Sequence, residues 1–452
     1  MKIFKRILFS FLIAILILVG IFFYTIRGEP KVTIDYVAEY NKISKPENFE
    51  PNQNAAELYK EAVKNFVQMP RVLTYLQTEW PTDFNSNDKA FFDKWLTANE
   101  NAIQMFRVAS LKPYFWTELY SRDGLTSSNS PEWVYSIYDL SKALLWDGKI
   151  KALNSNHSES FEDILACYRF GLQQCSSQCF MLSLSHCIGL QAESMRTAAL
   201  IIKKTPVPNE TLSNFQQELE KLSNGNSYVF DFTAEKMLLY DVIQRTYVYK
   251  PDESGLLAWK RKSDYYTLCG DGPWPLIKSI FVGPTQKEVK KEIDSYYDQL
   301  TAAYVLTPWQ LHQEKPDFFD KLFLGCQRGT LVLYVYGSDF QRIHLDYNKL
   351  QAQLKGLITT ISVLKFKNDN RQLPENLDKL IETGYLKELP GDPYSNKPLV
   401  YNADDKNFKI YSVGQNFIDD GGKERTDDIV FWPPRERPIH SDPNQPMQKL
   451  SE

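Results

Sequence analysis

The sequence has few histidines and no excess of positive charge, and both shortages narrow the range of functions. Of its 452 residues only 5 are histidine, and 52 Lys and Arg side chains stand against 56 Asp and Glu, for a net charge of -4. A nucleic-acid partner needs a basic face that displaces counterions from the phosphates. The sequence therefore predicts no nucleic-acid partner.

The motifs of the common enzyme classes are also missing. The chain contains no nucleophile elbow, no H-E-x-x-H pair, no glycine-rich phosphate loop and no dinucleotide fingerprint. Asp231, Glu235 and Asp241 fall on or beside one predicted helix, where two carboxylates can act as acid and base or simply form a solvated face. No catalytic residue is predicted, and a hydrolase whose site forms only in three dimensions stays open. The histidines stand apart in the sequence and are expected to be structural or exposed: His157, His186, His312, His344 and His440.

No C-x-x-C pair occurs among the cysteines, which disfavours the common zinc motifs. Cys175 and Cys179 are four residues apart, with His186 and Cys187 downstream, so a metal site is one interpretation. The simpler interpretation is that small apolar residues are buried between helices. Outside the cytoplasm an even number of cysteines permits disulfides. The six are Cys167, Cys175, Cys179, Cys187, Cys269 and Cys326.

Charge is absent from Ile7 to Ile26, a run of 20 residues. As a helix this run spans about 30 Å, the thickness of the hydrocarbon core of a bilayer. A cleaved signal peptide has a shorter apolar stretch that ends in small residues, and this run lacks such a site. We therefore predict a single-pass anchor in the inner membrane, represented by Ile7, Leu12, Leu16, Phe22 and Ile26. Lys2, Lys5 and Arg6 favour a cytoplasmic N-terminus, which places the bulk of the chain in the periplasm.

Residues 31–335 are predicted to form an α-helical domain. Apolar side chains recur at spacings of three and four residues, which places them on one helix face. The clearest such set is Phe161, Ile164, Leu165, Tyr168 and Leu172. Stacked antiparallel helix pairs are expected, and they offer a surface for a protein or peptide partner. Individual helices are predicted over residues 133–153, 177–203, 232–247 and 286–305.

A long helix beginning near Ser338 or Asp339 and a short antiparallel sheet are predicted for residues 336–432. The helix carries an unbroken apolar stripe that suits either a coiled coil or a helix laid across a sheet. Two short alternating segments, 398–402 and 408–413, read as a β-hairpin with a polar turn between them, so the second interpretation is favoured. The fold class is thus mainly α with a small α+β C-terminal module. The stripe consists of Phe340, Ile343, Tyr347, Leu350, Leu354, Leu357, Ile361 and Leu364.

An ordered series of short motifs follows the long helix. In sequence order it comprises Asp392-Pro393-Tyr394, Pro398, Tyr401, Tyr411-Ser412, Gly414, Asp419-Asp420-Gly421-Gly422, Asp428-Ile429 and Trp432. This series resembles the C-terminal domain of the major pseudopilins of type II secretion systems. The resemblance covers residues 338–432, about a fifth of the chain. It implies a helix packed on a sheet and a calcium ion in the acidic loop, and an accessory component of a secretion system of this type is one alternative function. In that family the hydrophobic helix joins this module directly, whereas here the apolar run lies more than 300 residues away, so assembly into a fibre is not expected.

The loop between Gly414 and Ile429 is rich in carboxylates, which repel one another unless a cation is present. Ca²⁺ takes six to eight oxygen ligands, and glycines let the backbone curl around it. Lys423 and Arg425 offer the alternative of a solvated acidic turn that needs no metal. Carried over by position, the resemblance implies a carbonyl ligand from Val413 and side-chain ligands from Asn416, Asp419 or Asp420, and Asp428.

Together these features predict a membrane-anchored extracytoplasmic scaffold or binding protein. Residues 1–30 hold a cytoplasmic stub and the anchor, and 31–335 and 336–432 form the two folded parts. Residues 433–452 contain five prolines among polar residues and are predicted to be disordered.

Overall fold

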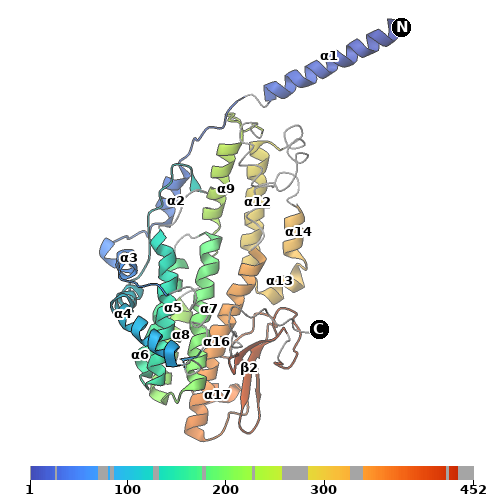
Figure 1. The fold of residues 1–452 in the computed structure, drawn as a ribbon. Coiled ribbons are helices and arrows are strands. Elements are labelled where there is room, and N and C mark those ends of the chain that lie inside the picture. Colours follow the sequence, from blue (N-terminus) through green and yellow to red (C-terminus); the bar gives the residue numbers. More distant parts are fainter. Residues whose placement is uncertain are drawn as a thin grey trace.

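The computed structural model describes residues 2–25, 28–69, 80–81, 86–125, 132–175, 180–225, 230–256, 284–325, 340–423 and 427–435. These residues form a mainly helical fold with a three-stranded antiparallel sheet near the C-terminus (Figure 1). This confirms the predicted fold class in its coarse form.

Four of the helices named below, α5, α7, α9 and α12, fall close to the predicted ranges 133–153, 177–203, 232–247 and 286–305. In the N-terminal half they are α1 (Lys2–Thr25), α2 (Tyr36–Ser44), the 3₁₀ turn η1 (Pro51–Gln53), α3 (Ala56–Lys64), α4 (Ser86–Ser110), α5 (Glu132–Leu153), α6 (His157–Cys175), α7 (Met181–Lys204) and α8 (Asn209–Gly225). In the C-terminal half they are α9 (Thr233–Thr246), α12 (Gln286–Tyr304), α13 (Pro308–Glu314), α14 (Phe318–Gly325), α16 (Phe340–Asn370) and α17 (Asp378–Glu382).

Helix α1 projects away from the rest of the molecule (Figure 1). The apolar side chains that are described on α1 lie in the open, with Ile7 64% and Leu16 61% exposed. Of the predicted anchor residues, Ile26 lies outside the described residues, and only the backbone of Phe22 is described. Within the described part of the chain, no helix is both long and apolar enough to cross a membrane. The predicted transmembrane span is therefore not confirmed.

The body is built from antiparallel helices that pack on their neighbours in sequence, as α5 does on α6 and α6 on α7. The predicted stripe of α6 is buried at Phe161, Ile164, Leu165 and Tyr168, which lie in the core shared by α3 to α8.

Helix α12 begins with a capping box, in which the Thr285 hydroxyl and the Glu288 carboxylate each accept an amide hydrogen bond.

Helix α16 joins the helical body to the sheet. It packs on α7 and α8 with one side and on the sheet with another, and a single hydrophobic cluster runs from α3 through α16 to the last strand. At Gly356 the sheet approaches so closely that an added Cβ would lie 2.6 Å from the Phe431 ring. Most of the predicted stripe is buried, but residues between its members, such as Thr359 and Val363, are buried as well. Among the described residues, one hydrophobic cluster thus includes side chains from before and after the predicted boundary at residue 336.

The sheet comprises β1 (Val400–Ala403), β2 (Phe408–Ser412) and β3 (Ile429–Trp432) in that order. Strands β1 and β2 form the predicted hairpin, with Val400 opposite Tyr411. Strand β3 pairs antiparallel with β2 on its other side, with a register shift between Ile410 and Tyr411. No strand was predicted over β3. The acidic loop therefore connects two adjacent strands, β2 and β3, and lies at one end of the sheet.

Candidate functional site: the acidic loop and its neighbours

A buried carboxylate fixes the start of the acidic loop. Asp392 is 2% exposed, and its Oδ1 accepts hydrogen bonds from the Ser412 hydroxyl (2.7 Å) and the Tyr394 amide (3.0 Å). Its Oδ2 accepts from the Ser395 hydroxyl (3.1 Å) and the Val413 amide (3.1 Å). Four donors satisfy both oxygens, so the Asp-Pro-Tyr turn is joined to the end of β2. The sequence placed Asp392 in the Asp-Pro-Tyr motif but predicted none of these hydrogen bonds.

The loop itself folds around Asp428, which is 4% exposed. The carboxylate of Asp428 accepts hydrogen bonds from the amides of Gly422 (2.6 Å) and Asp420 (3.4 Å). Gly414 has φ +72°, and a Cβ there would lie 1.9 Å from the carbonyl oxygen of Asp427. Only glycine fits where the two ends of the loop meet.

The predicted metal ligands are brought into one loop but do not all point to one spot. Asn416 Nδ2 donates to Asp420 Oδ2 (3.1 Å), and the Asp420 amide reaches Asp428. Asp419 turns to the sheet instead, where its Oδ1 accepts from the Tyr411 hydroxyl (2.9 Å). Burial first, and then Asp419, raise the pKa of Tyr411 to about 12. Among the described residues, no group of three or more His, Cys, Asp or Glu side chains is placed to hold a metal ion.

The loop also contacts the helical part of the chain. The His312 ring on α13 stacks on Phe417, with ring centroids 4.3 Å apart and an interplanar angle of 18°. The Trp309 amide, also on α13, donates to the Pro393 carbonyl (3.1 Å). Phe417 has φ +61°, a costly conformation for a bulky residue. Neither contact was predicted, because the partners lie some hundred residues apart in the chain.

The three carboxylates on or beside α9 serve different partners. Asp231 accepts from the amide two residues later (2.8 Å), at the start of its own helix. Glu235 accepts from the Met181 amide (2.6 Å), and burial raises its pKa although that hydrogen bond lowers it. Asp241 is 1% exposed and pairs with Arg245 at 2.9 Å. Each of the three carboxylates is thus engaged by a different partner.

The described histidines make packing contacts. His157 lies 3.2 Å from the Thr205 hydroxyl, and His344 Nε2 donates to the Leu306 carbonyl (2.9 Å). Burial lowers the pKa of both rings. The His186 ring lies 5.7 Å from that of Tyr138. His440 lies outside the described residues.

The described cysteines belong to the packed interior. Cys167, Cys175 and Cys187 are buried in the core, as the simpler interpretation expected. Cys179, Cys269 and Cys326 lie outside the described residues.

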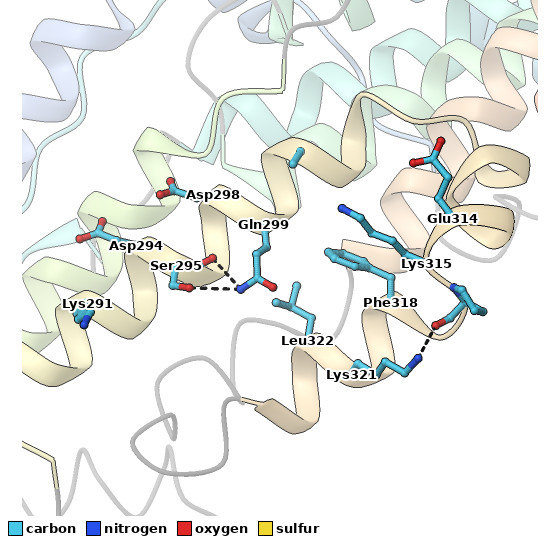
Figure 2. Close-up of a pocket in the computed structure, with 12 residues that line it drawn as sticks. Lys291, Asp294, Ser295, Asp298, Gln299, Glu314, Lys315, Phe318, Lys321 and Leu322 are labelled. Carbon is cyan, nitrogen blue, oxygen red and sulfur yellow. Dashed lines mark hydrogen bonds between the residues drawn. The ribbon is translucent and has the colours of Figure 1, made fainter.

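A surface hollow of about 880 Å³ lies between α12, α13 and α14 (Figure 2). Phe318 and Leu322 point into it from α14, and Gln299 faces them from α12, where it donates to the Ser295 carbonyl (3.0 Å). Charges of both signs surround Phe318 and Leu322, so the hollow suits a partner whose surface is partly polar and partly apolar. The charged residues are Lys291, Asp294, Asp298, Glu314, Lys315 and Lys321.

A second hollow of about 620 Å³ lies beside the acidic loop, between α7, α16 and β3. Arg196 lines it and pairs with Glu193 through Nη2 and Nε. Its Nη1 is buried and finds no partner among the described residues. Lys349 lines the same hollow from α16, and Asp427 from the loop.

Comparison of the chain with models of protein families, with curated proteins and with solved structures gave no match.

Proposed function

We propose that this protein is a single-pass, membrane-anchored binding or scaffold protein whose bulk lies outside the inner membrane. The observation that carries the proposal is the position of α1, which projects from the body (Figure 1). The apolar side chains described on this helix are exposed. Phe9 and Phe11 are 66% and 64% exposed. A long apolar surface that the body leaves uncovered favours transfer out of water, and the uncharged run from Ile7 to Ile26 matches the hydrocarbon core in length.

The anchor is tested on intact cells and isolated membranes. We expect the chain to stay in the membrane pellet after an alkaline carbonate wash, and protease added to spheroplasts to degrade the body. A chain that carbonate releases, or that protease leaves whole in spheroplasts, contradicts the proposal. A leucine pair replaced by arginine, Leu12→Arg with Leu16→Arg, is expected to abolish retention, because each charge at the centre of a span is costly.

A binding role is better supported than the hydrolase alternative. The carboxylates beside α9 are engaged with separate backbone and arginine partners, as a helix junction requires. The two hollows are broad and lined by both signs of charge, which suits a protein or peptide surface more than a small substrate.

We also propose that the acidic loop binds Ca²⁺, in keeping with its resemblance to the major pseudopilins. The donor chemistry fits: Asp419 Oδ2 and Asp420 Oδ1 accept no hydrogen bond from a described residue, and carboxylate oxygens are the ligands Ca²⁺ takes. Asp428 is already held by backbone amides, so the loop has a frame that does not depend on the ion. Bound Ca²⁺ would offset the repulsion between the carboxylates and stiffen this end of the sheet.

The calcium proposal is tested on the full-length chain in detergent. We expect heat on titration with CaCl₂, and a melting temperature that rises with Ca²⁺ and falls when a chelator is added. Asp420→Asn should weaken both effects, whereas Asp405→Asn, the same change at an exposed residue of the β1–β2 turn, should not. Equal responses from the two variants, or no heat and no shift with the native chain, reject the site.

A place in a type II secretion-like apparatus is a narrower form of the binding role. The feature that favours it is the same resemblance of residues 338–432. Purification of the chain from detergent-solubilised membranes should then recover a secretion component, and recovery of none counts against this alternative.

A further inference from the structure

Residues 28–34, which follow α1, contact the body at several points. The side chain of Gln244, on α9 and 5% exposed, accepts hydrogen bonds at Oε1 from the amides of Thr33 (3.0 Å) and Ile34 (3.2 Å). Its Nε2 donates to the Ile34 carbonyl (2.8 Å) and to Asp241 Oδ1 (2.8 Å). One amide side chain therefore satisfies this backbone much as a neighbouring strand would, and Asp241 holds that amide in place.

A second contact holds the beginning of the segment. The Tyr249 amide, just beyond the end of α9, donates to the Glu29 carbonyl (3.2 Å). The ammonium group of Lys31 lies over the Tyr249 ring, 5.1 Å from its centroid. At Gly28 (φ +142°) a Cβ would lie 2.5 Å from Val248 Cγ1, so only glycine allows this approach.

These contacts limit how far the body can stand from the anchor. Only three residues lie between Thr25, the last residue of α1, and Glu29, so the four Cα-to-Cα steps span at most about 14 Å even when fully extended. The headgroup region adds roughly 5–8 Å on each side of the hydrocarbon core. A body fixed at Glu29 therefore comes within reach of the headgroups.

We propose that the membrane-facing surface, formed by residues 28–34 and Tyr249, rests on the phospholipid headgroups and gives the body one fixed orientation on the bilayer. This inference depends on the proposed anchoring by α1. Its chemistry suits the interface, where tyrosine and lysine keep polar ends in water and apolar parts in lipid. Val32, Ile34 and Tyr249 are 49%, 43% and 40% exposed, beside Lys31. Exposed carboxylates in or next to this surface include Glu29, Asp35 and Asp252, so it carries both signs of charge and matches mixed headgroups.

The opposite end of α12 provides an internal control. This helix begins beside the membrane-facing surface, where the Gln286 amide donates to the Gly255 carbonyl (2.9 Å). It then runs away from α1 for 19 residues, about 28 Å (Figure 1). Val305, just beyond its end, is 81% exposed. It is an exposed apolar residue that the proposal keeps out of lipid.

The test places a photoreactive phenylalanine analogue at position 249 or at position 305 of the full-length chain in nanodiscs of phosphatidylethanolamine and phosphatidylglycerol. After illumination, mass spectrometry should find lipid adducts at 249 and only background at 305. Equal adduct yields at the two positions, or no adduct at 249 in a chain that still resists carbonate extraction, contradict the contact with the headgroups but not the anchoring by α1. A chain that carbonate removes overturns both proposals.

Hydrogen exchange tests the contact through Gln244 in the same nanodiscs. The amides of Thr33 and Ile34 should exchange slowly in the native chain. Gln244→Ala should accelerate their exchange by roughly tenfold, the equivalent of one to two net hydrogen bonds, and lower the adduct yield at 249. The matched control is Gln299→Ala, since Gln299 bonds only within its own helix. Fast exchange in the native chain, or no effect of Gln244→Ala, contradicts a fixed segment.

Discussion

The substitution Asp163→Asn is expected to change how the stability of the protein depends on pH. Asp163 is buried at the junction of three helices, with a fully covered side chain. Its Oδ1 accepts from Arg107 Nε on α4, and its Oδ2 lies 3.0 Å from Lys151 Nζ on α5. Asp147 bridges the same two cations, at 2.7 Å and 2.9 Å, so the four charges form a closed ring.

The magnitude follows from the proton that Asp163 binds. Burial raises its pKa from 3.8 to about 6, even though Arg107 and Lys151 oppose that change. The folded state therefore keeps this proton up to about pH 6, whereas the unfolded chain loses it near pH 4. Because the folded state binds more protons in that window, the free energy of unfolding falls as pH rises. The whole difference amounts to at most roughly 3 kcal/mol.

The assay is urea unfolding of the full-length chain and of Asp163→Asn in detergent, followed by far-UV circular dichroism from about pH 4 to about pH 8. The native chain should lose stability relative to the variant between about pH 4 and pH 6, and the difference should then stay constant. The offset at a single pH also reflects how asparagine packs, so the slope is the diagnostic quantity. Asp139→Asn, at an exposed pair on α5, controls for the loss of a charge. A flat difference, or one that grows in favour of the native chain as pH rises, refutes the reasoning.

The remaining predictions concern packing near the sheet. Asp392→Ala should lower the free energy of unfolding by roughly 2–4 kcal/mol, because four donors lose their acceptor. Asp405→Ala, at an exposed turn, should change it by less than about 0.5 kcal/mol. Similar losses for the two variants in denaturant unfolding would contradict the role of Asp392 as a buried acceptor. Gly356→Ala should cost roughly 1–2 kcal/mol, since a Cβ 2.6 Å from the Phe431 ring outweighs the gain in helix propensity. At Gly189 no atom lies within 4 Å of an added Cβ, so Gly189→Ala should instead stabilise the protein by up to about 1 kcal/mol in thermal unfolding. If both glycine variants stabilise the protein, α16 does not pack on β3 as described.

The acidic loop shows how far a motif series reaches. Its residues could be assigned to one loop from sequence order alone, and Asn416, Asp420 and Asp428 are in contact there. The direction of each carboxylate could not be assigned. Asp419 turns to Tyr411 because a hydroxyl on β2 lies within reach, and that depends on the register of the strands.

Local periodicity by itself determined the helices, the β-hairpin and the uncharged N-terminal run, because each depends on residues within a few positions of one another. Only the tertiary structure decided which distant groups meet. Gln244 holds Thr33 across 211 residues, and α16 is buried by α7, α8 and the sheet together, so neither partner carries a local signal. Side-chain polarity can mark a residue as one that needs a partner when it is buried, but only the packed chain supplies that partner.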